Sequence, residues 1–127
     1  MDNDKIYFSS CAFKSKTLKD LLSEANSVGI KNLELSGDLI YATDDRELII
    51  KNSNNFNFML HNYCFNAKKP FLLNLAADDL DERDHVIEHV KSLCDLTSEI
   101  GNSVYSLHWG YAFKSIYTPV GDSNQFA

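Results

Sequence analysis

The feature that most constrains the fold is a regular alternation of short β-prone runs with segments of helical character. The β-prone runs occupy residues 5–10, 31–37, 56–62 and 103–109. Between them, apolar residues at helical spacing predict helices over 15–29 and about 79–100, and acidic residues open a weaker helical segment over 44–53. Strands that alternate with helices are typical of parallel sheets joined by crossovers. The sequence therefore predicts an α/β fold with about four parallel strands.

Two architectures are compatible with this order, an open doubly wound sheet and part of a (β/α)8 barrel. The turn after the first run, SSCAFKSK at residues 9–16, contains no glycine, which excludes the dinucleotide-binding fingerprint. A complete barrel takes about 250 residues, whereas this chain has 127 and only a polar stretch follows its fourth run. We therefore expect residues 1–127 to form a single partial domain, the N-terminal half of a (β/α)8 TIM barrel.

The charge distribution limits the kinds of partner. The net charge is −6, and the lysines are scattered or stand in small groups, so no basic stripe is available to hold a phosphate backbone. This argues against nucleic acid as a partner but is compatible with a small phosphorylated ligand.

Compartment signals are few. No apolar run approaches the roughly 20 residues that span a bilayer, and the N-terminus MDNDKIYFSS does not resemble a signal peptide. Three widely spaced cysteines, an odd number, are typical of free thiols in a reducing compartment. We expect a cytoplasmic protein that has no membrane as a partner.

Two histidines occupy matching places in successive strand-like runs. His61 in LHNYCF and His108 in LHWGYAF each follow a leucine at the end of an apolar run, 108 − 61 = 47 positions apart. Side chains alternate between the faces of a strand, and the apolar residues suited to the outer, helix-covered face are Phe58, Leu60, Tyr105 and Leu107. Both histidines would then point inward at the carboxyl ends of neighbouring strands, where barrel active sites lie. The alternative, two polar caps hydrogen-bonded to backbone, stays open.

Four segments give the chain a family resemblance. GIKNLELSG (29–37), FNFMLHNY (56–63), FLLNLAADD (71–79) and GNSVYSLHWGYAF (101–113) resemble, in this order, the N-terminal half of the xylose-isomerase-like barrel superfamily. That superfamily contains sugar isomerases and epimerases and the endonuclease IV group, and the chain is most similar to its members from bacterial surface-polysaccharide gene clusters. The chain departs from the pattern at Asp38, where the family has a second glycine.

The resemblance implies a function for the complete protein. It implies a sugar isomerase or epimerase that binds a sugar or sugar phosphate and moves a proton next to a carbonyl, with a divalent metal (Zn, Mn or Mg) bound by His61 and His108. An endonuclease IV-like zinc phosphodiesterase and a non-catalytic binding or assembly module are the alternatives. The catalytic carboxylates would lie beyond Ala127. We expect the 127-residue chain alone to be inactive, to bind metal weakly or not at all, and to associate through its open sheet edges.

Three further residues are candidates for substrate binding. Tyr63 and Trp109 closely follow the two histidines, and aromatic rings of this kind can stack on a sugar. Glu34, an acid inside the second strand, could contact a substrate hydroxyl or equally pair with a Lys or Arg.

A histidine pair and two cysteines could belong to a metal or catalytic site, but the residues around them favour a structural role. The HVIEH segment places His85 and His89 one helical turn apart, a spacing that can bind zinc, although Glu does not follow the first histidine as it does in HExxH proteases. We expect both on a solvated helix face. Cys11 and Cys64 could lie near the rim as nucleophile or ligand, but without a Cys-x-x-Cys pair we expect buried or unreactive thiols.

Overall fold

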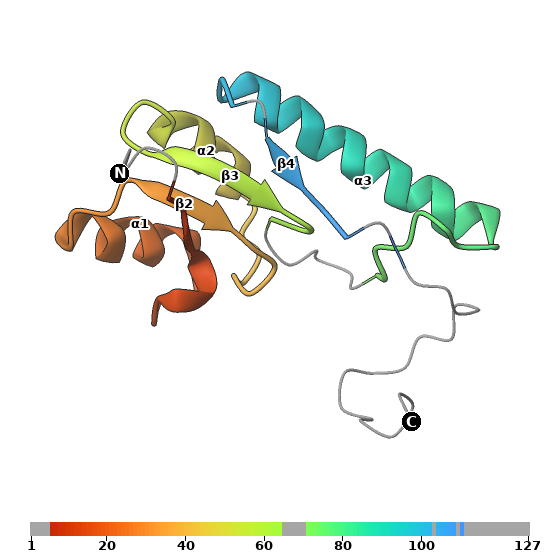
Figure 1. The fold of residues 1–127 in the computed structure, drawn as a ribbon, viewed down its shortest axis with the longest axis horizontal. Coiled ribbons are helices and arrows are strands. Elements are labelled where there is room, and N and C mark those ends of the chain that lie inside the picture. Colours follow the sequence, from red (N-terminus) through yellow and green to blue (C-terminus); the bar gives the residue numbers. More distant parts are fainter. Residues whose placement is uncertain (1–5, 65–70, 103, 109, 111–127) are drawn as a thin grey trace.

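The computed structural model describes residues 6–64, 71–102, 104–108 and 110 (Figure 1). Strands and helices alternate along the chain as predicted. In chain order the elements are β1 (Phe8–Ser9), the 3₁₀ helix η2 (Ser10–Ala12), α1 (Leu18–Ser27), β2 (Asn32–Leu35), α2 (Asp45–Asn52), β3 (Asn57–His61), α3 (Leu80–Glu99) and β4 (Tyr105–Ser106).

The two longer helices begin at side-chain caps. The side chain of Thr17 accepts a hydrogen bond from the backbone N–H of Asp20 at the start of α1, and Asp79 accepts one from the N–H of Glu82 at the start of α3. Such caps satisfy backbone donors that have no partner inside the helix. After α1 the chain passes through Gly29 at φ +76, a left-handed conformation that glycine adopts without steric cost. These local signals explain why both helices could be predicted from the sequence.

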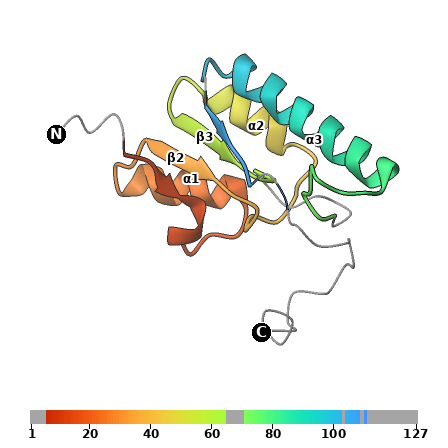
Figure 2. The ribbon, with the colours of Figure 1, turned by 45° about the vertical axis from the view of Figure 1, so that its right-hand side comes forward.

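The strands form one parallel sheet in the order β1-β2-β3-β4. Each strand therefore lies beside its neighbour in sequence, and the arrowheads of β2, β3 and β4 point toward the same end of the sheet in Figure 1. Crossovers between parallel strands are right-handed, so an order that never reverses places successive helices on the same face. In agreement, α2 contacts both α1 and α3, and α2 and α3 lie together behind β3 in Figure 2.

The burial pattern shows that only one face of the sheet is covered. Along β3, Phe58 and Leu60 are buried, whereas Met59 and His61 are half-exposed. β2 alternates in the same way, with Leu33 and Leu35 buried. The buried strand residues share one hydrophobic cluster with residues from all three helices: Leu18, Leu21, Leu22, Ala25, Ile49, Leu93 and Leu96. The predicted alternation along β3, with Phe58 and Leu60 on one face and Met59 and His61 on the other, is confirmed.

The outer strands are shorter than the sequence suggests. β1 and β4 each span two residues, and parts of the predicted strands, at residues 5, 103 and 109, lie outside the described residues. The segment 71–76 forms no helix or strand, yet Leu73 and Asn74 within it are buried. Within the described ranges, every helix is too short or too polar to cross a membrane.

Candidate functional site

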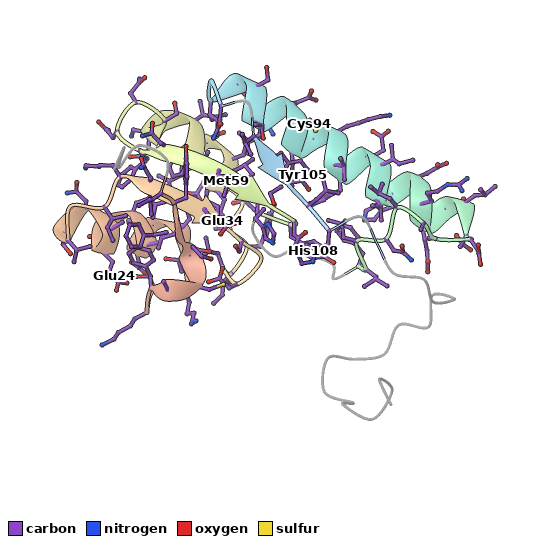
Figure 3. The ribbon with its side chains drawn as sticks, viewed as in Figure 1. Glu24, Glu34, Met59, Cys94, Tyr105 and His108 are labelled. Carbon is purple, nitrogen blue, oxygen red and sulfur yellow. The ribbon has the colours of Figure 1, made fainter. Side chains whose placement is uncertain are left out.

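The carboxyl ends of β2, β3 and β4 gather polar side chains on the face without helices. His61 and Ser106 are register partners on adjacent strands, and Glu34 precedes them on β2, where it pairs with Met59. Figure 3 shows Glu34 and His108 with the strand ends between them. We call the set Glu34, His61, Asn62, Ser106 and His108 the rim cluster.

His61 is the centre of the rim cluster. Its Nδ1 lies 3.1 Å from Oγ of Ser106 and 3.5 Å from Oε1 of Glu34. The side chains of His61 and Glu34 are 22% and 24% exposed, so a ligand can still reach them. The alternative partner expected for Glu34, a Lys or Arg, is not found in the described part of the chain, where its ion-pair partner is His61. A substrate contact by Glu34 stays a prediction.

Asn62 connects the two histidines. Its Nδ2 lies 2.9 Å from Nε2 of His61, and its Oδ1 accepts a 2.9 Å hydrogen bond from the backbone N–H of His108. Its backbone carbonyl accepts a 2.6 Å hydrogen bond from the hydroxyl of Tyr105. The residue has φ +50, a left-handed conformation that asparagine tolerates better than most residues. The end of β3 is thus tied to β4 and to the segment that follows it.

The spacing of the two imidazoles is compatible with one shared cation. The rings of His61 and His108 have centroids 5.2 Å apart and meet edge to face at 82°. Two imidazoles on a tetrahedral zinc, with Zn–N distances of about 2.0–2.1 Å, would place their centroids about 5 Å apart. Among the described residues, however, no group of three or more His, Cys, Asp or Glu is placed to hold a metal. Any such site takes further ligands from elsewhere.

Of the two aromatic residues predicted to bind substrate, only Tyr63 lies in the described part of the chain. The hydroxyl of Tyr63 donates to the carbonyl of Phe71 at 3.0 Å and accepts from the N–H of Leu73 at 2.8 Å. Tyr63 therefore fastens the segment after β3, and its role in substrate binding stays a prediction. Trp109, the other candidate, lies outside the described residues.

The segment that follows β3 also meets the end of β4. Asn74 is buried, and its Oδ1 accepts a hydrogen bond from the N–H of Ala76. A Cβ atom on Gly110, which has φ +138, would overlap this Oδ1. A glycine is therefore required at this close approach, two residues after His108.

A buried serine in η2, directly after β1, is hydrogen-bonded to the loop after β2. Oγ of Ser10 donates to Oδ1 of Asp38 and accepts from the backbone N–H of Ser36 at 3.0 Å. Asp38 therefore links the loop after β2 to η2.

His89 corrects the prediction of a solvated pair on α3. His85 is exposed as expected, but His89 is half-buried, with its ring 5.9 Å from Tyr63 and 5.0 Å from Phe71 between centroids. Burial lowers the pKa of His89, opposed by a hydrogen bond with the backbone of Asn62 and reinforced by nearby His85. The helical spacing alone did not show that the segment after β3 folds against this helix.

The lowered pKa of His89 predicts an acid-sensitive stability. Unfolding returns the imidazole to its usual pKa of about 6.5, so below that pH the unfolded chain binds more protons and stability falls until the pH reaches the folded pKa. We expect urea unfolding to show this loss between about pH 7.5 and pH 5.5 and His89→Phe to reduce it. His85→Gln, which removes only the smaller contribution of His85 to the lowered pKa of His89, should reduce the loss less than His89→Phe does. An equal loss in wild type and His89→Phe would contradict this assignment.

The three cysteines are free thiols, and Cys64 is buried as one of the two expected alternatives. Cys64 is buried, and burial, with a smaller effect of Asp45, strongly raises the pKa of its thiol, which disfavours a thiolate nucleophile. Cys11 and Cys94 are exposed, and none of the three forms a disulfide.

The comparisons with known proteins identify no relative. No family model, no curated protein and no solved structure matches the chain.

Proposed function

We propose that this chain forms one half of a (β/α)8 barrel, with the helix-free face of its sheet lining the interior. The support is the strand order β1-β2-β3-β4 together with a single helical layer. A doubly wound sheet reverses its strand order and carries helices on both faces. The inner-face residues Glu34, Met59 and His61 are half-exposed in this chain, as expected for a surface that a second half would cover.

The sheet edges support the same proposal. Phe8 on β1 is 44% exposed, and Val104 beside β4 is 47% exposed. Open edges with apolar side chains favour pairing with further strands. In the complete protein these would be strands of the other half, and in the isolated chain they would be strands of a second copy.

We propose that the complete protein is a sugar isomerase or epimerase that acts on a sugar or sugar phosphate, possessing a divalent metal at the rim cluster. The observation that carries the proposal is the approach of His61 and His108 at the carboxyl ends of adjacent strands. A bound cation would supply polarisation of the substrate carbonyl. His61 and His108 would hold it, and carboxylates of the other half would move the proton. Free cysteines favour a reducing compartment, the cytoplasm.

Two alternatives are less well supported by the residues. An endonuclease IV-like phosphodiesterase must attract DNA, which a net charge of −6 disfavours. A non-catalytic module for surface-polysaccharide assembly would keep the fold without needing a metal or a proton acceptor at the rim.

Isotope exchange separates these possibilities. The full-length protein, loaded with Zn²⁺, Mn²⁺ or Mg²⁺ in turn, would be incubated in D₂O with a panel of aldoses, ketoses and their phosphates. NMR would report deuterium at the carbon next to the carbonyl, and we expect exchange that a chelator abolishes. Sugar binding without exchange would favour the binding module, and nicking of abasic DNA would favour the phosphodiesterase. Either result would overturn the proposal.

A further inference from the structure

The hydrogen bonds around Asn62 determine which end of its side chain is the amide nitrogen. The backbone N–H of His108 can only donate, so the Asn62 atom 2.9 Å from it must be the oxygen. The other end, which faces Nε2 of His61 at 2.9 Å, is therefore the NH₂ group. An amide nitrogen donates and does not accept.

This orientation determines the tautomer of His61. Because Nε2 accepts a hydrogen bond from Asn62, that ring nitrogen carries no proton in the neutral imidazole, and the proton resides on Nδ1. The surroundings of Nδ1 agree, since Oγ of Ser106 at 3.1 Å can accept this hydrogen bond and the carboxylate of Glu34 lies 3.5 Å away. Both sides of the ring thus favour the same tautomer.

We propose that Asn62 is a positioning residue that holds His61 as the Nδ1–H tautomer and keeps its Nε2 lone pair ready for a divalent cation, which displaces the amide when it binds. The inference rests on the proposed function for the cation, but the tautomer itself does not. A histidine that binds a metal through one nitrogen usually donates its other N–H to an oxygen acceptor. Ser106 and Glu34 supply that acceptor here, which makes Glu34 a second positioning residue.

Three residues hydrogen-bond to Asn62 in addition to His61. Tyr105 on β4 donates to its carbonyl, His89 on α3 hydrogen-bonds to its backbone, and His108 binds its side chain. A displaced amide could therefore leave Nε2 by side-chain rotation while the backbone stays in place.

The test is ¹⁵N NMR of the histidine side chains in the full 127-residue chain, at alkaline pH and without metal or substrate. In wild type, Nε2 of His61 should show the shift of a nitrogen without a proton. Asn62→Asp keeps the acceptor for the N–H of His108 but replaces the amide donor with a carboxylate oxygen. We expect Nε2 to gain a proton in more than half of these molecules. Asn62→Gly keeps the left-handed backbone accessible and removes both contacts, and it should give a smaller change.

The outcomes separate this inference from the proposed function. A proton on Nε2 in wild type, or an unchanged Nε2 in Asn62→Asp, would overturn the inference whatever the protein catalyses. A correct tautomer in a protein that exchanges no substrate proton would leave the inference standing and remove the proposed function. Glu34→Gln keeps an oxygen acceptor without the charge and leaves Asn62 intact, so it should retain the Nδ1–H form. Loss of that form in Glu34→Gln would show that Glu34 and not Asn62 holds the tautomer, and it would overturn the inference.

Discussion

Alanine in place of His61 or His108 should lower the divalent-metal affinity or the turnover of the full-length protein at least tenfold. Tenfold is about the lower limit of the losses that follow when the residues around a metal site are changed. Each imidazole would be one of only two ligands that this half supplies. Metal content after dialysis and initial rates of substrate-proton exchange are the measurements. His85→Ala is the control, because His85 is an exposed histidine of α3 whose ring packs on Phe71 and not on the rim cluster, and it should leave both unchanged.

The stability of these variants distinguishes a binding site from a structural cap. His61 and His108 lie at the end of the sheet rather than in its hydrophobic cluster, so we expect little change in melting temperature. If both alanine variants keep full metal content and activity yet melt several degrees lower, the histidines are caps on the core and the site assignment is wrong.

Phe58→Ala should lower the free energy of unfolding by about 3–5 kcal/mol, the usual cost of truncating a buried phenylalanine. Phe58 is 2% exposed in the middle strand β3 and stacks on Phe56 with centroids 5.9 Å apart. Because small domains are stable by only about 5–15 kcal/mol, this loss should be plain in a urea titration.

The neighbouring residue provides a control for the one-sided sheet. Met59 lies next to Phe58 but on the face without helices (Figure 3), where it is half-exposed. Met59→Ala in the 127-residue chain should cost about 1 kcal/mol, near the average for point substitutions. Equal losses at the two positions would show that both faces of the sheet are covered, which would contradict the half-barrel proposal.

The fold was predictable because its signals are local. Thr17 and Asp79 cap helices through their own side chains, and the alternation along 56–62 separates two faces without reference to the rest of the chain. The approach of His61 and His108 at the ends of adjacent strands was predicted from the same alternation, but the register partner of His61 is Ser106, and His108 lies two residues beyond β4. The short extent of β1 and β4 was not predictable, since strand pairing depends on neighbours as well as on residue type.

The parts of the site that escaped prediction depend on long-range contacts. Asn62 was not among the predicted site residues, and only the approach of His108 and Tyr105, more than forty positions later, makes it the link of the rim cluster. The sequence predicted a solvated His89, whereas in the structure Phe71 packs against this residue of α3. No local pattern in the sequence predicts such long-range contacts. The position of Asn62 directly after the candidate ligand His61 is the one local signal that could have suggested its contact with that ring.

Anomalous diffraction from crystals of the full-length protein grown with Zn²⁺ would test the central claim most directly. We expect a peak at the zinc edge between His61 and His108, within about 2.0–2.1 Å of a ring nitrogen of each. For His61 that nitrogen should be Nε2, with the Asn62 amide moved away. Absence of zinc at this position, with Asn62 still hydrogen-bonded to His61, would contradict the account.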